Sequence, residues 1–156
     1  MFSSQAYRVK LVSTYRIRGM EFNLFATAIA AISGIIIGAV WFGPKTFFPL
    51  WWKFLGKNPS EQPGTDNMAV IFGSTTVAAI VQAVVMSVVI GLAEQATGGM
   101  DTVTGLAVGA LMGFGFAASA SVSHHLFGGF PIKAWILEAG QDIVALAVMG
   151  AIIASF

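Results

Sequence analysis

The sequence contains no cysteine and few charged residues. Without cysteine the chain of 156 residues has no disulfides, thiol nucleophiles or thiolate metal ligands. Charged residues make up 10% of it, against about 25% in a typical soluble domain. The net charge of +1 gives no electrostatic field for nucleic acid, and the aromatic residues lie in apolar runs rather than among basic ones. This composition predicts a chain that lies in membrane lipid and does not bind nucleic acid.

Familiar catalytic motifs are also missing. No phosphate loop, dinucleotide fingerprint, serine nucleophile elbow or zinc-protease motif occurs. The pair Gly113-x-Gly115 follows no predicted strand, so it favours helix packing over phosphate binding. Little of the chain lies outside long apolar runs, so no separate extramembrane enzyme domain, cofactor or metal site is predicted.

Long apolar runs fill most of the chain. Four of them reach the ~20 residues that a helix needs to cross a ~30 Å hydrocarbon layer. They are Phe22–Phe42, Met68–Leu92, Val103–Phe127 and Ile132–Phe156. Gly128-Gly129-Phe130-Pro131 predicts a tight turn, which makes the last two runs antiparallel neighbours. We predict an all-α fold, an integral membrane four-helix bundle that forms one domain over residues 20–156.

An aromatic segment separates the first two runs. Gly43 and Pro44 end the first helix, just after Trp41. In residues 45–57, aromatic and leucine side chains recur every three or four positions, with lysines on the other faces, which predicts a short helix lying in the membrane interface. The residues expected at the interface are Trp41, Trp51, Trp52 and Lys53. Residues 58–67 form the one polar loop.

Small residues recur every fourth position in three of the runs. Helices in lipid associate through close backbone contact along such faces. These stripes predict a tight bundle and favour a homo-oligomer or a complex with other membrane subunits. Their members are Ala26, Ala30, Gly34 and Gly38 in the first run, Ala79, Ala83, Ser87 and Gly91 in the second, and Gly105, Gly109, Gly113, Ala117 and Ser121 in the third.

Residues 1–19 carry four basic residues and no acid. This composition suits a transit peptide, a basic arm on anionic lipid, or an extension that precedes Met20. The first apolar run is too long for a signal-peptide core, so we expect it to be retained. The orientation stays open, because four lysines, Lys45, Lys53, Lys57 and Lys133, balance the arm across the membrane.

Two acids interrupt the fourth run. Asp142 lies near the midplane, about 15 Å into the helix at 1.5 Å per residue. An ionised aspartate there costs about 2.5–3.5 kcal/mol, so Asp142 should face the bundle or carry a proton. Glu138 lies one turn earlier on the same face, which allows the two carboxylates to share a proton or cation. Gln82, near the middle of the second run, can reach the same layer.

Two histidines close the third run at about the depth of Glu138. Neighbouring residues on a helix point about 100° apart, so only one of His124 and His125 readily faces the carboxylates. His125 continues the small-residue face and is the predicted partner. A histidine–carboxylate pair can relay protons, bind a metal, or join two helices, and the last is the commoner use. The candidate catalytic residues are Asp142, Glu138 and His125, and the candidate binding set adds His124 and Gln82.

Several motifs together resemble a known family. They are Gly38-Ala39-Val40-Trp41-Phe42-Gly43-Pro44 with the aromatic segment that follows it, the Gly-Phe pattern of 113–116, Leu126-Phe127, Phe130-Pro131, Ala139-Gly140 and Met149-Gly150-Ala151. Over about residues 22–155 the chain resembles the small bacterial membrane proteins called domain of unknown function 1761 (DUF1761). The resemblance implies a four-helix protein of a bacterial inner membrane, with no established activity. It also implies uncharged or aromatic residues near positions 138 and 142, so the acidic pair departs from the family pattern.

Three functions remain open. The first is a non-enzymatic accessory subunit, favoured by the small-residue stripes and the missing motifs. The second is a small transporter or proton-coupled binding protein that uses Asp142 and Glu138. The third is an intramembrane enzyme in which Glu138 and Asp142 act as acid and base with help from His125.

Overall fold

Four long helices and one short helix make up the fold. The structure is a computed structural model that describes residues 14–17, 20–58, 61 and 67–156, so most of the predicted basic arm and of the polar loop lies outside the described residues. The long helices are α1 (Leu24–Trp41), α3 (Met68–Thr97), a run of α4 (Thr102–Met112), η1 (Gly113–Ala118) and α5 (Ser119–Phe127), and α6 (Ile132–Ala154). Each of the four is long and apolar enough to cross a membrane. The short helix α2 (Phe48–Phe54) lies between the first two. The predicted all-α four-span bundle is confirmed, and the protein is a multi-pass integral membrane protein.

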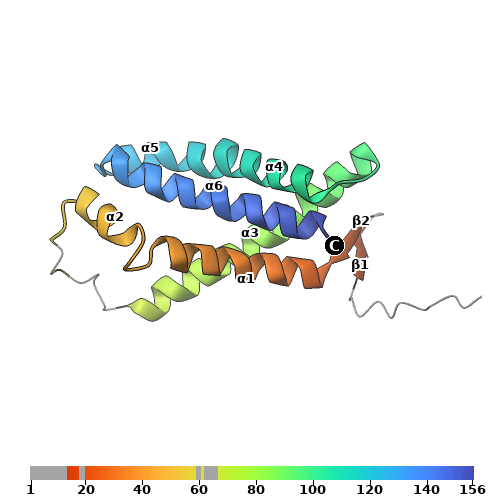
Figure 1. The fold of residues 1–156 in the computed structure, drawn as a ribbon, viewed down its shortest axis with the longest axis horizontal. Helices are drawn as coiled ribbons and strands as arrows, with labels where there is room; N and C mark the ends of the chain where they lie inside the picture. Colours follow the sequence, from red (N-terminus) through yellow and green to blue (C-terminus); the bar gives the residue numbers. More distant parts are fainter. Residues whose placement is uncertain (1–13, 18–19, 59–60, 62–66) are drawn as a thin grey trace, which may run out of the picture.

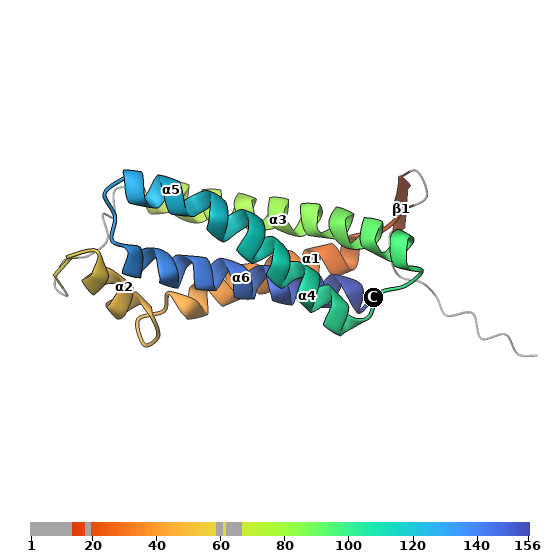
Figure 2. The ribbon, with the colours of Figure 1, turned by 90° about the horizontal axis from the view of Figure 1, so that it is seen from above.

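The helix α6 lies at the centre of the bundle. Figure 1 shows α1 and the α4–α5 run along its two sides, while α3 crosses the others at an angle, and Figure 2 shows α3 lying to one side of α6. The 30 residues of α3 make a helix of about 45 Å, longer than the ~30 Å hydrocarbon layer, which agrees with its oblique course. The short helix α2 packs against the first turns of α6, at the end of the bundle where the α5–α6 turn lies.

The ends of the helices follow from local chemistry. The Asn23 side chain accepts a hydrogen bond from the Ala26 amide and starts α1. Asp101 does the same for α4, at 2.7 Å from the Thr104 amide, and hydrogen bonds from the side chain and amide of Thr104 hold the pKa of Asp101 below its usual value. Gly129, at φ 77°, supplies the left-handed residue of the predicted turn between α5 and α6.

The glycine stripe of the third run lies against α6. A Cβ on Gly109 would clash with the carbonyl oxygen of Leu146, and a Cβ on Gly113 would lie 2.6 Å from the Cα of Ile143. A Cβ on Gly105 would meet the backbone of Gly150 at 2.5 Å. The two helix backbones therefore touch, as the stripe predicts.

The stripes of the other two runs are also used inside the chain. Ala26, Ala30 and Gly34 of α1 are buried, and Gly34 lies against the Met149 side chain of α6. Ala79, Ala83 and Ser87 of α3 are buried as well. The tight bundle needs all three stripes, so they no longer argue for an oligomer. The oligomer stays a prediction.

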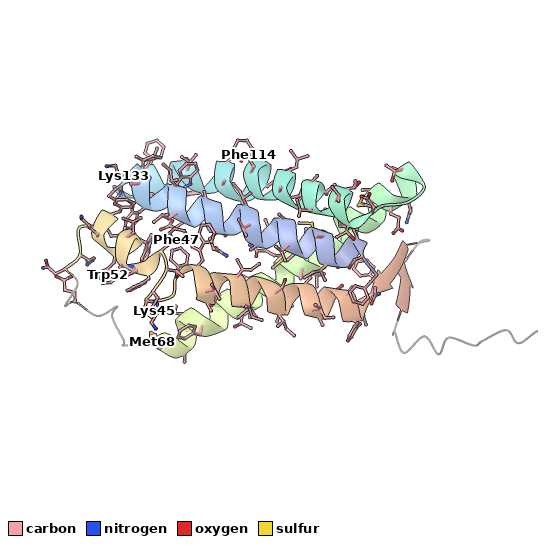
Figure 3. All side chains as sticks on the ribbon, in the orientation of Figure 1. Lys45, Phe47, Trp52, Met68, Phe114 and Lys133 are labelled. Atoms are coloured by element: carbon pink, nitrogen blue, oxygen red, sulfur yellow. The ribbon has the colours of Figure 1, made fainter. Side chains whose placement is uncertain are left out.

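Two local features were not predicted. Two short segments form antiparallel strands, β1 (Thr14–Ile17) and β2 (Met20–Asn23), in which Tyr15 pairs with Phe22. The third span contains the π-helical turn η1, a wider turn that leaves Phe114 pointing away from the bundle (Figure 3). Such turns are rare in helices and often lie at functional sites.

A buried hydrogen bond joins α1 to α3. The hydroxyls of Thr27 and Ser87 are 2.7 Å apart, and both residues are buried. We expect Thr27→Val to lower the free energy of unfolding in mild detergent by about 0.5–1.5 kcal/mol, because one interhelical hydrogen bond is lost. Thr76→Val is the control, since the Thr76 hydroxyl bonds only to the Phe72 carbonyl of its own helix. Equal losses in the two variants would contradict the prediction.

Candidate functional site

Glu138 lies at the junction of three helices. Its Oε2 is 3.2 Å from Nδ1 of His125 on α5, and its Oε1 accepts a 2.7 Å hydrogen bond from the indole of Trp51 on α2. The other ring nitrogen of His125 is 3.2 Å from the carbonyl oxygen of Pro131, in the turn before α6. The His125 side chain is 10% exposed and that of Glu138 is 35% exposed. We call Trp51, His125, Pro131 and Glu138 the Glu138 cluster.

The tryptophans near this end hold the short helix in place. The Trp41 indole donates to the Leu137 carbonyl of α6, and the Trp52 indole donates to the carbonyl of Asn58. Lys53 is exposed. Figure 3 shows Trp52, Lys45 and Lys133 gathered at the same end of the bundle. Aromatic and basic side chains together are typical of a membrane interface, and the interface position of these residues stays a prediction. Trp41 and Trp51 also dock α1 and α2 onto α6.

A cavity of about 640 Å³ lies between α1, α3 and α6. Its walls come from the last turns of α1, the first half of α3, the Phe42–Pro44 turn and the middle of α6, and most of them are apolar. The cavity exists because α3 crosses the bundle at an angle: its residues 68–78 are all exposed, and the first buried one is Ala79. This volume falls in the range of small-molecule sites, about 300–1,000 Å³.

Besides two threonines, three polar residues line this cavity. They are Gln82 of α3 and Gln141 and Asp142 of α6. Within the described part of the chain no hydrogen bond or ion pair engages them, whereas the cavity hydroxyls of Thr75 and Thr76 bond to carbonyls of their own helix. The cavity therefore offers one carboxylate and two amides to an occupant.

Tight packing fixes the position of Asp142. Gly113 of η1 lies against the backbone of Asp142 and Ile143, where an added Cβ would be 3.3 Å from the Asp142 carbonyl oxygen. Gly113 is not among the residues that line the cavity. The backbone of Asp142 is thus backed by the third span while its side chain meets the cavity.

The structure divides the residues singled out from the sequence into two sets. His125 lies against Glu138, and Gln82 lines the same cavity as Asp142. Glu138 does not line the cavity, and within the described residues no hydrogen bond joins it to Asp142. His124 is exposed and makes no side-chain hydrogen bond to another described residue. Among the described residues no cluster of three or more histidine or acidic side chains is placed to hold a metal ion.

Sequence reasoning missed two members of these sets. Gln141 is polar and next to Asp142 in the sequence, and that adjacency was a usable signal. The hydrogen bond from Trp51 to Glu138 left no signal, because aromatic spacing alone does not show which indole meets an acid 87 positions away.

The family model described as "Protein of unknown function (DUF1761)" matches residues 25–154. The chain belongs to this family. Searches of curated proteins and of solved structures find no match.

The matched range takes in both sets of residues. The cavity of this DUF1761 protein runs from Gly34 to Ala145 in the sequence, and the Glu138 cluster runs from Trp51 to Glu138. The family carries no assigned function, so any function has to be argued from the cavity and the cluster themselves.

Proposed function

We propose that the protein is a membrane-embedded binding protein for a small amphipathic cation. The observation that carries the proposal is the cavity whose mostly apolar walls hold Asp142, Gln82 and Gln141 without partners among the described residues. An ionised aspartate in the middle of a span costs about 2.5–3.5 kcal/mol, and a bound cation offsets that cost. Apolar walls suit a hydrocarbon or aromatic body, and the two amides accept hydrogen bonds from an amine.

The route of entry supports a ligand that comes from the bilayer. The cavity is bordered by the exposed first part of α3, residues 68–78, which faces the lipid in a four-span bundle. A molecule dissolved among the acyl chains meets this face without crossing a polar barrier. Binding is the step proposed here, and release on the opposite side of the membrane would extend it to transport.

The test uses two probes of one shape in lipid nanodiscs. One is a lipophilic quaternary ammonium ion, and the other is its neutral carbon analogue. We expect Asp142→Asn to weaken binding of the cation at least tenfold, which corresponds to about 1.4 kcal/mol, and to leave the neutral analogue unchanged. Calorimetry or a spin-labelled probe gives both affinities.

Glu138→Gln is the matched control. It removes the same charge from the same helix, one turn away, but Glu138 does not line the cavity. We expect it to keep the affinity for the cation within about twofold. Equal weakening by the two variants, or no preference of the parent protein for the cation, would contradict the proposal.

An accessory subunit remains the second candidate. The specific observation in its favour is the first half of α3, where eleven successive positions, 68–78, are exposed and lie beside the bundle. A helix of another subunit, or of a second copy, would fit against it. Crosslinking in the native membrane, which we propose is a bacterial inner membrane, tests this. Recovery of a lone monomer in mild detergent with no crosslinked partner would argue against it.

The enzyme hypothesis ranks third. It needs Asp142, Glu138 and His125 around one substrate, and the cavity reaches only Asp142 of these three. A single carboxylate in the cavity, with no second acid or base among the residues that line it, suits binding better than acid–base chemistry.

A further inference from the structure

The Glu138 cluster has more hydrogen-bond acceptors than donors, and one added proton would supply the missing donor. Nε2 of His125 is 3.2 Å from the carbonyl oxygen of Pro131. A carbonyl oxygen only accepts, so Nε2 carries the hydrogen and donates it. In a neutral imidazole with its hydrogen on Nε2, the other nitrogen, Nδ1, holds a lone pair. Oε2 of Glu138 lies 3.2 Å from Nδ1.

A carboxylate oxygen also accepts and does not donate. Two acceptors at this distance repel each other unless a proton lies between them. The proton can sit on the imidazole, as an imidazolium–carboxylate pair, or on the carboxyl group, as a neutral pair. In both cases the second oxygen of Glu138 still accepts from the Trp51 indole. We propose that His125 and Glu138 form a proton-binding site, and that the bound proton lets Glu138 hold α2 and α5 together.

Loss of that proton breaks only one side of the bridge. The bond from Trp51 to the carboxylate survives, since an indole donates well to an ionised oxygen. The contact with His125 does not survive, because the lone pair of Nδ1 then faces a negative oxygen. The carboxylate rotates away from α5, and α2 and α5 are no longer joined.

The surroundings contain few other charges. On the elements packed around Glu138, the charged or titratable residues within the described chain are Lys53 of α2, His124 of α5, and Lys133 and Asp142 of α6. Lys133 lies 5.9 Å from the centre of the Phe54 ring, and Lys53 and His124 are exposed. The helix α1 and the turn η1 bring none.

The site is distinct from the cavity, but the two are connected by aromatic contacts. The ring of Trp51 meets that of Phe42 edge to face, with 5.5 Å between their centres, and Phe42 lines the cavity. The proton site nevertheless needs no ligand in the cavity, so its test does not depend on the proposed function. About a third of the Glu138 side chain is exposed, which gives protons access to the site from outside the bundle.

The experiment measures the distance between α2 and α5. The chain has no cysteine, so spin labels on Lys53→Cys and Phe127→Cys are the only ones attached. Phe127 is 94% exposed and tolerates a label. In nanodiscs without added ligand, we expect one narrow distance at neutral and acidic pH. As pH rises and the proton leaves, the distribution broadens, and the ratio of joined to separated molecules falls by up to tenfold per pH unit.

Glu138→Gln should reverse the direction of this profile. The amide accepts from Trp51 through its oxygen and donates to Nδ1 through its nitrogen, so it joins α2 and α5 without an extra proton. Protonation of the ring then sets two donors against each other. We expect a narrow distance at alkaline pH and broadening as pH falls. A Glu138→Gln profile that broadens in the same direction as that of the parent would overturn the proposal.

Two further variants complete the test. His125→Gln donates to the carboxylate at every pH, so its distance should stay narrow throughout, and it replaces Glu138→Gln should that variant fail to fold. His124→Gln is the matched control, on the neighbouring exposed histidine, and should keep the parent profile. Alkaline broadening in His125→Gln, or loss of the pH dependence in His124→Gln, would also overturn the proposal.

Discussion

Gly109→Val should destabilise the bundle more than any other single change considered for this protein. Gly109 is buried, and a Cβ there would clash with the carbonyl of Leu146 and lie 2.8 Å from the Cα of Ala147. Both are backbone atoms, so no side chain can rotate out of the way and α4 must move off α6. We expect the free energy of unfolding to fall by about 3 kcal/mol, at the upper end of the usual cost of overpacking. Unfolding in mixed micelles of mild detergent and dodecyl sulfate measures it.

Gly115→Val is the matched control. Gly115 lies in the same span, six residues further on, and nothing lies within 4 Å of an added Cβ. The same change of residue there alters lipid contact and helix propensity but no interhelical packing. We expect it to change the free energy of unfolding by less than about 1 kcal/mol. If the two variants were equally stable, close backbone contact between α4 and α6 would not hold the bundle together.

The contrast between Gly109 and Gly115 shows how far the sequence determines the fold. The stripe Gly105, Gly109, Gly113 has the four-residue spacing of one helix face, and that spacing predicts close packing. The spacing alone does not show which helix packs against the glycines. A helix of the same chain and a helix of a second copy were both compatible with it. The neighbour is α6 of the same chain, because the short turn at Gly128–Pro131 places it there.

The π-helical turn η1 could not be predicted from residue spacing. A pattern with a period of 3.6 residues continues through Gly113–Ala118 in the sequence, and the wider turn adds one residue without leaving a mark in composition. The end of the second span was predicted at Leu92, whereas α3 continues to Thr97. Gly98 and Asp101 carry recognisable chemistry for ending one helix and starting the next.

For the site, the sequence supplied the residues but not the neighbours that each one meets. Glu138 and Asp142 are four positions apart on one helix, so helical geometry alone places them together. What separates them is the surroundings: α2 and α5 cover Glu138, and the gap between α1 and α3 lies over Asp142. No pattern within one helix reveals which neighbours it meets. The contact between His125 and the acid was predictable, because the tight turn fixes α5 against α6.

Replacing these two acids by leucine should therefore shift stability in opposite directions. Asp142→Leu removes a carboxylate that has no hydrogen-bond partner among the described residues and puts an apolar side chain into an apolar cavity. Insertion scales place Asp about 3 kcal/mol above Leu at the centre of a span. We expect Asp142→Leu to raise the free energy of unfolding by about 1–3 kcal/mol and to abolish binding of the cationic probe. A gain in stability with loss of function is typical of a residue kept for binding.

Glu138→Leu should do the reverse. It leaves the Trp51 indole and the His125 ring without their acceptor and detaches α2 and α5 from α6 at this end of the bundle. Losing one acceptor for two donors costs about 1–3 kcal/mol. The same micelle unfolding measures both variants, and the double variant should give the sum of the two effects within about 0.5 kcal/mol if the two sets of residues act independently. If both leucine variants lowered the free energy of unfolding, Asp142 would have a structural partner in the native protein. That result would contradict the assignment of the cavity as the binding site.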